Sequence, residues 1–276
     1  VAVPRHRHNL RRPLTPLVGR AETIDDLCRK LLDPQYPLLV LVGEGGIGKT
    51  RLALATAWSL VAMNVNRDYS GMTAHRTALS FPDGIWFIPV NELIPQALTG
   101  SDDVAERVAA AISTTLSLPF SKAELVVQQL LSWLSQKALL LILDGFEHLK
   151  AADAFLSMIV QSAYRVKVLV TSRRRLNLQA ATIVPVQELA TPDSTTAANA
   201  PVEQLQSYPS IQLFVERVQR IRMDFQIDLQ NGPTIAQICR LVGGMPLGIE
   251  LAAAMMTIYS ASKIVEQLTQ DDVNLQ

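Results

Sequence analysis

Cysteine is scarce in this sequence. The chain contains two cysteines, Cys28 and Cys239, which lie far apart and without the spacing of metal ligands. Two isolated thiols in a chain of this size are typical of reduced core residues in a cytoplasmic protein, and they argue against a disulfide framework or a cysteine-bound metal. We therefore expect a cytoplasmic protein that is held together by its hydrophobic core, for which 49% hydrophobic residues are sufficient.

Net charge and long apolar runs are also missing. Lys and Arg number 25, as do Asp and Glu, so the formal net charge is zero. A neutral chain has no overall attraction for nucleic acid or for an anionic membrane. No apolar run approaches the roughly 18–20 residues of a membrane span, and the first residues do not form the apolar segment of a signal peptide. We expect no membrane partner and no direct nucleic-acid binding by this chain.

The first 16 residues combine four arginines with three prolines. Proline removes a backbone donor and blocks regular structure, so residues 1–16 are predicted to be a flexible lead-in. A basic arm that touches an acidic or phosphate group is the alternative.

Strand-like and helix-like segments alternate from residue 17 to about residue 190. Short apolar runs predict buried strands, at 37–42, 85–90, 139–143, 166–170 and 182–186. Amphipathic patterns between them predict helices, the clearest at 22–32, 50–63, 102–116 and 122–136. Residues 64–80 are polar and are predicted to be a surface insertion. This alternation indicates an α/β fold of three αβα layers with a five-stranded parallel sheet.

The composition changes near residue 190. Residues 191–209 are rich in Thr, Pro, Ala, Ser and Asn, which predicts a linker between domains. Only helical patterns follow, at 210–222, 233–242, 246–259 and 261–269. The chain is therefore predicted to have an α/β domain at 17–190 and a small helical domain at 210–276.

A glycine-rich segment directly follows the first predicted strand. It matches the phosphate-loop pattern G-x-x-x-x-G-K-[ST] and opens a predicted helix, as phosphate binding requires. Glycine permits the positive φ angles that turn N–H groups toward phosphate, while the lysine reaches the β- and γ-phosphates and the threonine hydroxyl binds Mg²⁺. The residues predicted to bind the nucleotide here are Gly43, Gly45, Gly46, Ile47, Gly48, Lys49, Thr50 and the adjacent Arg51.

An acidic residue ends the third predicted strand. Asp144 follows five apolar residues, and a carboxylate in that position is costly unless it meets a cation. We expect Asp144 to hold Mg²⁺ together with Thr50. A helix-capping role for Asp144 is compatible with this assignment.

Two further residues are candidates for acting on the γ-phosphate. Glu147 lies three residues beyond Asp144 and is placed to polarise a water, although it is equally typical of an ordinary first-turn glutamate. Arg173 ends the fourth predicted strand, at the edge that faces the ligand crevice of a parallel sheet. The following Arg174 and Arg175 have the pattern of a solvated basic turn.

Five ordered motifs together resemble a known family. They are Leu17-Val18-Gly19-Arg20-x-Glu22, the phosphate loop, LLLILDGFEHL, VLVTSR, and the segment from Gly243 to Ala252 that begins Gly-Gly-Met-Pro-Leu. In this order they resemble the NB-ARC (AP-ATPase) family of STAND P-loop NTPases, and most of all the bacterial branch found in multidomain transcriptional regulators.

The resemblance implies an adenine nucleotide, ATP or ADP, as the ligand. It implies that Val18 and Gly19 lie against the adenine and ribose, that Arg20 closes that side, and that Pro246 packs on the base. It also implies that Arg173 is the first sensor of the γ-phosphate. Members of the family hold ADP when inactive, and exchange for ATP rotates their domains and permits self-oligomerisation.

The sequence departs from the family in two ways. A winged-helix domain is expected after the small helical domain but is not in this chain, so C-terminal winged-helix and sensor domains are expected beyond it. Gly145 stands where many active ATPases have a catalytic acid. The resemblance therefore predicts a regulatory switch with weak ATPase activity. A working ATPase motor and a nucleotide-locked scaffold are the alternatives; a GTPase is disfavoured because no Asn-Lys-x-Asp segment occurs.

Overall fold

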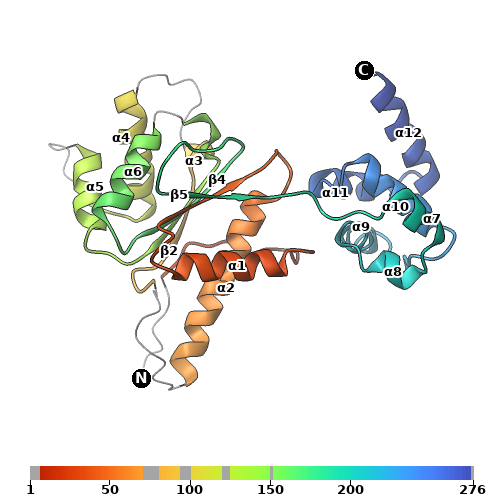
Figure 1. The fold of residues 1–276 in the computed structure, drawn as a ribbon, viewed down its shortest axis with the longest axis horizontal. Coiled ribbons are helices and arrows are strands. Elements are labelled where there is room, and N and C mark those ends of the chain that lie inside the picture. Colours follow the sequence, from red (N-terminus) through yellow and green to blue (C-terminus); the bar gives the residue numbers. More distant parts are fainter. Residues whose placement is uncertain (1–6, 71–80, 94–100, 120–124, 150–151, 275–276) are drawn as a thin grey trace. The chain divides into compact units, whose positions relative to one another are not determined.

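The computed structural model describes residues 7–70, 81–93, 101–119, 125–149 and 152–274 (Figure 1). These residues form two compact units, one built on the sheet and one made mainly of the helices after the last strand. The short stretches 17–21 and 44–48 group with the second unit.

The first unit contains a fully parallel sheet. Its strands are β1 (Leu38–Val42), β2 (Ile85–Pro89), β3 (Leu140–Asp144), β4 (Lys167–Ser172) and β5 (Ala181–Pro185), in the spatial order β2-β3-β4-β1-β5. β3 and β4 are buried along their whole length, as the unbroken apolar runs predict. The α/β fold class predicted from the alternation is confirmed.

Helices cover the sheet (Figure 1). They are α1 (Ala21–Leu32), α2 (Lys49–Ser70), α3 (Val90–Leu93), α4 (Ser101–Thr115), α5 (Val126–Leu134), the 3₁₀ turn η1 (Phe146–His148) and α6 (Asp153–Ser162). One core cluster joins α4, α5 and α6 to alternate residues of the strands, among them Val40 and Leu141. α2 packs against β1 and β4. Helix α2 continues through residues 64–70, where an insertion is predicted; residues 71–80 of that insertion lie outside the described part.

A buried lysine fastens α1 to the sheet. Lys167, at the start of β4, is 1% exposed, and its Nζ donates hydrogen bonds to the carbonyl oxygens of Asp33 and, at 2.9 Å, Tyr36. These carbonyls lie where the chain leaves α1 and approaches β1. Burial lowers the pKa of Lys167 from 10.5 to about 8, and the nearby Asp33 partly opposes this shift.

Part of the predicted flexible lead-in lies along the open edge of the sheet. The Asn9 side chain both accepts from the N–H of Phe87 and donates to its carbonyl oxygen, each at 2.7 Å. The ring of His8 packs edge-on against Trp58 of α2, and the indole Nε1 donates to the carbonyl oxygen of Arg11. Residues 7–12 therefore make defined contacts where a flexible lead-in is predicted: they lie along β2, beside which the described residues place no further strand of the sheet on the outer side. Residues 1–6 lie outside the described part.

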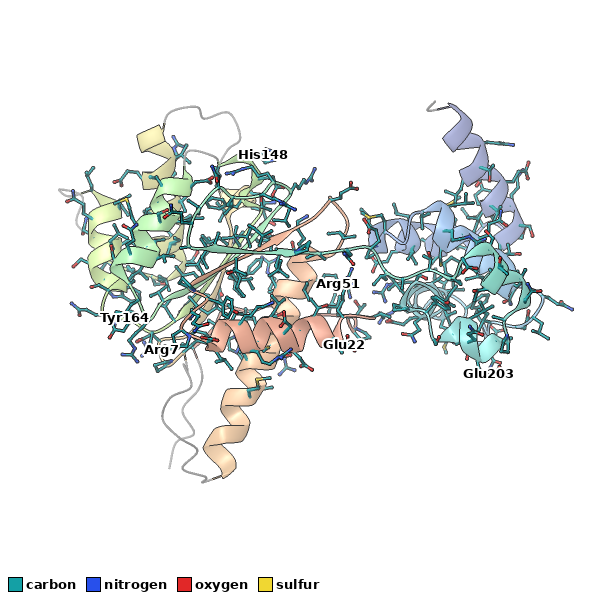
Figure 2. All side chains as sticks on the ribbon, viewed as in Figure 1. Arg7, Glu22, Arg51, His148, Tyr164 and Glu203 are labelled. Atoms are coloured by element: carbon teal, nitrogen blue, oxygen red, sulfur yellow. The ribbon has the colours of Figure 1, made fainter. Side chains whose placement is uncertain are left out.

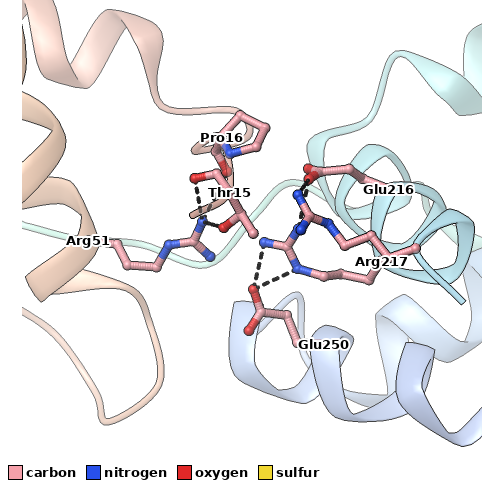
Figure 3. A network of polar contacts seen from close by, with 7 residues as sticks. Thr15, Pro16, Arg51, Glu216, Arg217 and Glu250 are labelled. Atoms are coloured by element: carbon pink, nitrogen blue, oxygen red, sulfur yellow. Dashed lines mark hydrogen bonds and ion pairs between the residues drawn. The ribbon is translucent and has the colours of Figure 1, made fainter. Parts of the chain in front are cut away.

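The second unit is helical. Its helices are α7 (Ser194–Asn199), α8 (Val202–Gln206), α9 (Pro209–Gln219), α10 (Gly232–Leu241), α11 (Pro246–Met255) and α12 (Ala261–Asn274). Its core includes the fully buried Ile211, Phe214, Ile235 and Ile249. Arg217 of α9 joins α11 by two hydrogen bonds, at 2.9 and 3.0 Å, to one carboxylate oxygen of Glu250 (Figure 3).

The stretch predicted to be a linker, 191–209, has regular structure. Helices α7 and α8 lie within it, and they bury Ala197 and Leu205 in the core of the second unit. The Asp193 carboxylate caps α7 by accepting a hydrogen bond from the Thr196 N–H at 2.7 Å. Each helix is too short to produce a detectable period in the sequence, which is why the polar composition suggested a linker.

Candidate functional site

The segment from Gly43 to Thr50 joins β1 directly to α2, as the motif requires. Gly46 and Gly48 have φ angles of 82° and 93°, which residues with a side chain rarely adopt. Helix α2 begins at Lys49, so the free N–H groups of its first turn and the positive end of its dipole lie at the loop. The backbone therefore has the local geometry predicted for a phosphate-binding loop.

Lys49 lies back along this loop. Its Nζ donates a hydrogen bond to the carbonyl oxygen of Gly43 at 2.8 Å. Burial lowers its pKa, with the charges of Glu147, Arg173 and Asp144 as smaller influences of mixed sign. The four charged groups that the sequence selected are therefore close enough to influence one another.

The hydroxyl of Thr50 meets the carboxylate of Asp144. Thr50 Oγ1 donates to Asp144 Oδ1 at 2.7 Å, and the Thr171 hydroxyl donates to the same oxygen at 2.6 Å. The Gly145 N–H in turn donates to Thr171 Oγ1 at 2.9 Å. Asp144 is 8% exposed, so this bonding compensates for its burial. Thr171 belongs to the VLVTSR motif, but the sequence does not indicate this role for it; its signal is a polar residue near the carboxyl end of an apolar strand.

Hard oxygen donors of this kind suit Mg²⁺, which takes one or two protein oxygens and completes its shell with water and phosphate. Within the described residues, His, Cys, Asp and Glu form no cluster of three or more that would hold a metal by themselves. The Thr50 hydroxyl and the Asp144 carboxylate are oxygen donors of the kind that fit Mg²⁺.

The position after Asp144 has no room for a side chain. Gly145 has a φ of 81°, and a Cβ placed on it would lie 2.6 Å from Cβ and Cγ of Asn91. Asn91 belongs to α3, the short helix that follows β2. The backbone angle at 145 thus favours glycine, and an acidic side chain there would also collide with Asn91.

The two candidate catalytic residues contact each other. Arg173 Nε lies 3.3 Å from Glu147 Oε1. Arg173 is 63% exposed and Glu147 is 14% exposed. The second oxygen, Oε2, is buried and has no hydrogen-bond partner among the described residues. A carboxylate oxygen left in this way has the capacity to accept a hydrogen bond from a water or ligand.

The next arginine is not a solvated turn residue, contrary to the sequence interpretation. Arg174 forms a two-point ion pair with Asp153 of α6, at 2.7 and 3.0 Å. Its Nε also donates to the main-chain oxygen of Glu147 at 3.2 Å. The spacing of the sequence gave no sign that Asp153 would be its partner, because the two residues lie in separate elements.

Arg51 contacts other residues of the first unit. It lies in the first turn of α2 (Figure 2). Its Nη2 donates to the main-chain oxygens of Thr15 and Pro16, at 3.3 and 3.0 Å (Figure 3). The guanidinium thereby holds the segment that leads into Val18. Nucleotide contact by Arg51 stays a prediction.

The residues expected at the adenine meet on one segment of the second unit. Arg20 Nη2 donates to the main-chain oxygen of Gln187, and burial lowers the pKa of Arg20 while Glu188 opposes this. Gly19, with a φ of 69°, leaves no space for a side chain because a Cβ would lie 2.4 Å from Cβ of Pro209. Val18 packs, partly buried, against the helical core.

The Gly-Gly-Met-Pro-Leu turn reaches the same segment. The Leu189 N–H donates to the carbonyl oxygen of Gly244 at 3.0 Å, and Gly244 has a φ of 65°. Pro246 is the first residue of α11, where its fixed φ and missing N–H are tolerated. Residues 187–189 thus contact both the Val18–Arg20 stretch and the turn that carries Pro246.

The described part of the chain contains no helix with the length and apolar character needed to cross a bilayer.

The chain is similar to known proteins over most of its length. The chain is 28% identical over 263 residues, 95% of its length, to an uncharacterized protein of Mycobacterium tuberculosis, and covers 56% of that protein. It is 26% identical over 237 residues to a Mycobacterium tuberculosis protein whose name describes it as an HTH-type transcriptional regulator, covering 85% of this chain and 22% of the relative. The chain therefore spans about half, or less, of the length of these relatives.

Solved structures agree in fold. The Walker-type ATPase of Pyrococcus abyssi aligns over 95% of this chain and 76% of its own, with a TM-score of 0.52 and 15% identity. The Hsp104–ADP complex of Saccharomyces cerevisiae aligns over 92% of this chain and 41% of its own, with a TM-score of 0.53 and 16% identity. The family model of the AAA ATPase domain matches residues 16–170, more than half of the chain, which with the phosphate loop and Asp144 establishes that the chain belongs to the AAA ATPase domain family.

Proposed function

We propose that this chain is the ATP- and ADP-binding switch module of a STAND-type signalling or transcriptional regulator, of the NB-ARC kind, and that it hydrolyses ATP slowly. The observation that carries the proposal is the hydrogen bond between Thr50 and Asp144 at the end of the phosphate loop. It joins the hydroxyl expected on Mg²⁺ to the carboxylate expected to hold the same ion.

Gly43–Thr50 bind the phosphates, and Lys49 is the cation that turns from the loop to contact them. A bound phosphate replaces the Gly43 carbonyl as the partner of Lys49, because a dianion attracts an ammonium group more strongly than a neutral carbonyl does. Thr50 and Asp144 would hold Mg²⁺, which neutralises the charge of the β- and γ-phosphates. Val18, Gly19, Arg20 and Pro246 are proposed to form the adenine side, since their segments meet at residues 187–189.

The residues at the end of β3 support the proposal of slow turnover. Fast hydrolysis needs a positioned water and charge stabilisation on the γ-phosphate. Position 145 offers neither, because of its glycine backbone and the adjacent Asn91. Glu147 is then the acid available to polarise water, and Arg173 the cation available to the γ-phosphate; each holds the other by an ion pair. A long-lived ATP state suits a switch that has to be read by other domains.

The regulator assignment is supported by the relative described as an HTH-type transcriptional regulator, which has room for further domains. We propose that winged-helix and sensor domains accompany the chain in the whole protein, that the protein acts in the cytoplasm, and that the ATP state favours self-oligomerisation. The two buried free cysteines fit a reducing compartment.

The first experiment identifies the nucleotide. Denaturing the purified protein and separating the released nucleotides is expected to give ADP or ATP. Titration with ATP and GTP is expected to show a preference for adenine of at least tenfold, equivalent to about 1.4 kcal/mol. Lys49→Ala is expected to abolish binding and leave the circular dichroism spectrum unchanged. ATP affinity at the wild-type level in Lys49→Ala contradicts the phosphate-loop assignment.

The second experiment separates a switch from a motor and a scaffold. Single-turnover and steady-state hydrolysis of ATP are measured on the wild type, Glu147→Gln and Arg173→Ala. A switch gives a rate far below the roughly 1–10³ s⁻¹ of ordinary enzymes, with both variants slower still. A wild-type rate of several per second supports a motor instead. If both variants match a slow wild type, neither residue is catalytic and a scaffold role is favoured over a switch.

A further inference from the structure

Two neighbouring arginines after β4 are held in different ways. Arg173 is 63% exposed and touches Glu147 through one ion pair of 3.3 Å. Arg174 is 21% exposed and donates hydrogen bonds to both carboxylate oxygens of Asp153, which is 20% exposed. An exposed single pair contributes little and exchanges readily, whereas a two-point arginine–carboxylate pair has a defined direction and is stronger. Arg174 is therefore the fixed member of the two and Arg173 the exchangeable one.

The fixed arginine also touches the main chain of Glu147. Its Nε donates to the Glu147 carbonyl oxygen at 3.2 Å, from the same guanidinium that is anchored on Asp153. Glu147 lies in η1, a single 3₁₀ turn of three residues that ends with a hydrogen bond from the Leu149 N–H to the Phe146 carbonyl oxygen. So short a turn has little stability of its own, and its place is set by what it contacts.

The Glu147 side chain pairs with Arg173, and its charge also raises the pKa of Lys49. One carboxylate oxygen pairs with Arg173, while the buried second oxygen has no partner among the described residues. We propose that Arg174, anchored by Asp153, is a positioning residue that holds the Glu147 backbone so that this second oxygen faces the attacking water. The inference rests on the proposed function, because it concerns the water that attacks a bound ATP.

The chemistry requires accurate placement of this oxygen. Glu147 accepts a proton from water as the water oxygen forms a bond to the γ-phosphorus. The bond from that phosphorus to the β,γ-bridging oxygen breaks, ADP and inorganic phosphate result, and the proton leaves Glu147 with the products. Displacing a catalytic group by about 1 Å can lower the rate on the order of 10²-fold. Loss of the arginine fork is such a displacement, and it leaves the phosphate loop untouched.

The test uses Arg174→Lys and Asp153→Asn, with Arg175→Ala as the matched control for removing an exposed charge from the same turn. ATP affinity and the single-turnover hydrolysis rate with bound ATP are measured separately. Arg174→Lys and Asp153→Asn are expected to keep ATP affinity within about twofold and to lower the rate by about ten- to a hundredfold. Arg175→Ala is expected to change neither quantity by more than about twofold. Retained ATP affinity also shows that the variants are folded.

A double-mutant cycle with Glu147→Gln locates the effect. If Arg174 acts through Glu147, Arg174→Lys slows the wild type and has no further effect on Glu147→Gln. An equal loss in both backgrounds, or an equal loss in Arg175→Ala, overturns the proposal. Trapping of ADP with aluminium fluoride, which needs no turnover, is expected to fall in the same variants.

The outcomes separate this inference from the proposed function. A wild type that binds ATP but neither hydrolyses it nor traps the fluoride complex overturns the positioning role and leaves nucleotide binding intact. A wild type that binds no adenine nucleotide overturns the proposed function itself.

Discussion

The hydroxyl of Thr50 lies 2.7 Å from the carboxylate of Asp144, although 94 positions separate them in the chain. Thr50 lies in the first turn of the helix after β1 and Asp144 ends β3, and β4 lies between these two strands in the sheet. Thr171 of β4 bonds the same carboxylate oxygen, so three secondary-structure elements meet at one atom. Such convergence at the carboxyl edge is the usual setting of ligand sites in parallel sheets.

Asp144→Asn is expected to remove the magnesium dependence of ATP binding. The amide oxygen of asparagine still accepts both hydroxyl hydrogen bonds, so the fold is retained, but the charge that attracts the cation is lost. We expect ATP affinity in the presence of Mg²⁺ to fall at least tenfold, or about 1.4 kcal/mol. Calorimetric titrations with ATP, in the presence of Mg²⁺ and in the presence of EDTA, measure this change in affinity. The exposed Asp224→Asn is the control. A variant that still responds to Mg²⁺ like the wild type refutes the metal assignment.

Gly145→Ala is expected to destabilise the first unit. A side chain at a φ of 81° costs about 1–3 kcal/mol, and the added Cβ also meets Asn91. Urea unfolding of Gly145→Ala, alone and combined with Asn91→Gly, separates the two causes. The double variant is expected to recover the part due to contact and to keep the part due to the backbone angle. Full stability of the single variant contradicts the geometry at this position.

Lys167 is expected to make stability rise with pH between about 8 and 10.5. The folded-state pKa of about 8 lies below the model-compound value of 10.5. In this interval the unfolded chain binds the proton more tightly than the folded chain does, so the free energy of unfolding increases as the pH rises. The full effect is on the order of 3 kcal/mol.

Urea unfolding at pH 7.5 and pH 10 of wild type and Lys167→Met tests this. Other groups titrate in both proteins, so the informative quantity is the difference between the two pH dependences. When the free energy of unfolding of Lys167→Met is subtracted from that of the wild type, the difference should increase with pH. An identical pH dependence in both proteins excludes a shifted lysine.

Asn9→Ala is expected to loosen the arm from the edge of the sheet. The variant loses both hydrogen bonds to the Phe87 main chain. Because Asn9 is exposed, we expect a loss of about 1 kcal/mol, within the usual range for hydrogen bonds. The clearer signal is faster hydrogen exchange at the Phe87 amide, which loses its acceptor. The exposed Asn177→Ala is the control, and unchanged exchange at Phe87 in Asn9→Ala would show that the arm does not protect this edge.

Local features of the chain were determined by the sequence itself. The phosphate loop could be recognised because phosphate is bound by consecutive backbone groups, so its glycines, Lys49 and Thr50 are adjacent in the chain. The strands could be recognised because burial on both faces demands unbroken apolar runs. Asp144 could be selected because a carboxylate at the end of such a run needs a partner.

The tertiary structure alone decided which residues meet. The strand order β2-β3-β4-β1-β5 puts β3 between β2 and β4, so Asp144 gains Thr171 on one side and Gly145 meets Asn91 from the other. Likewise Arg174 pairs with Asp153, and residues 7–12 contact β2, only after the chain has folded. No periodicity encodes these pairs, since each depends on how separate strands and helices pack, and packing is set by the whole core rather than by neighbours in sequence.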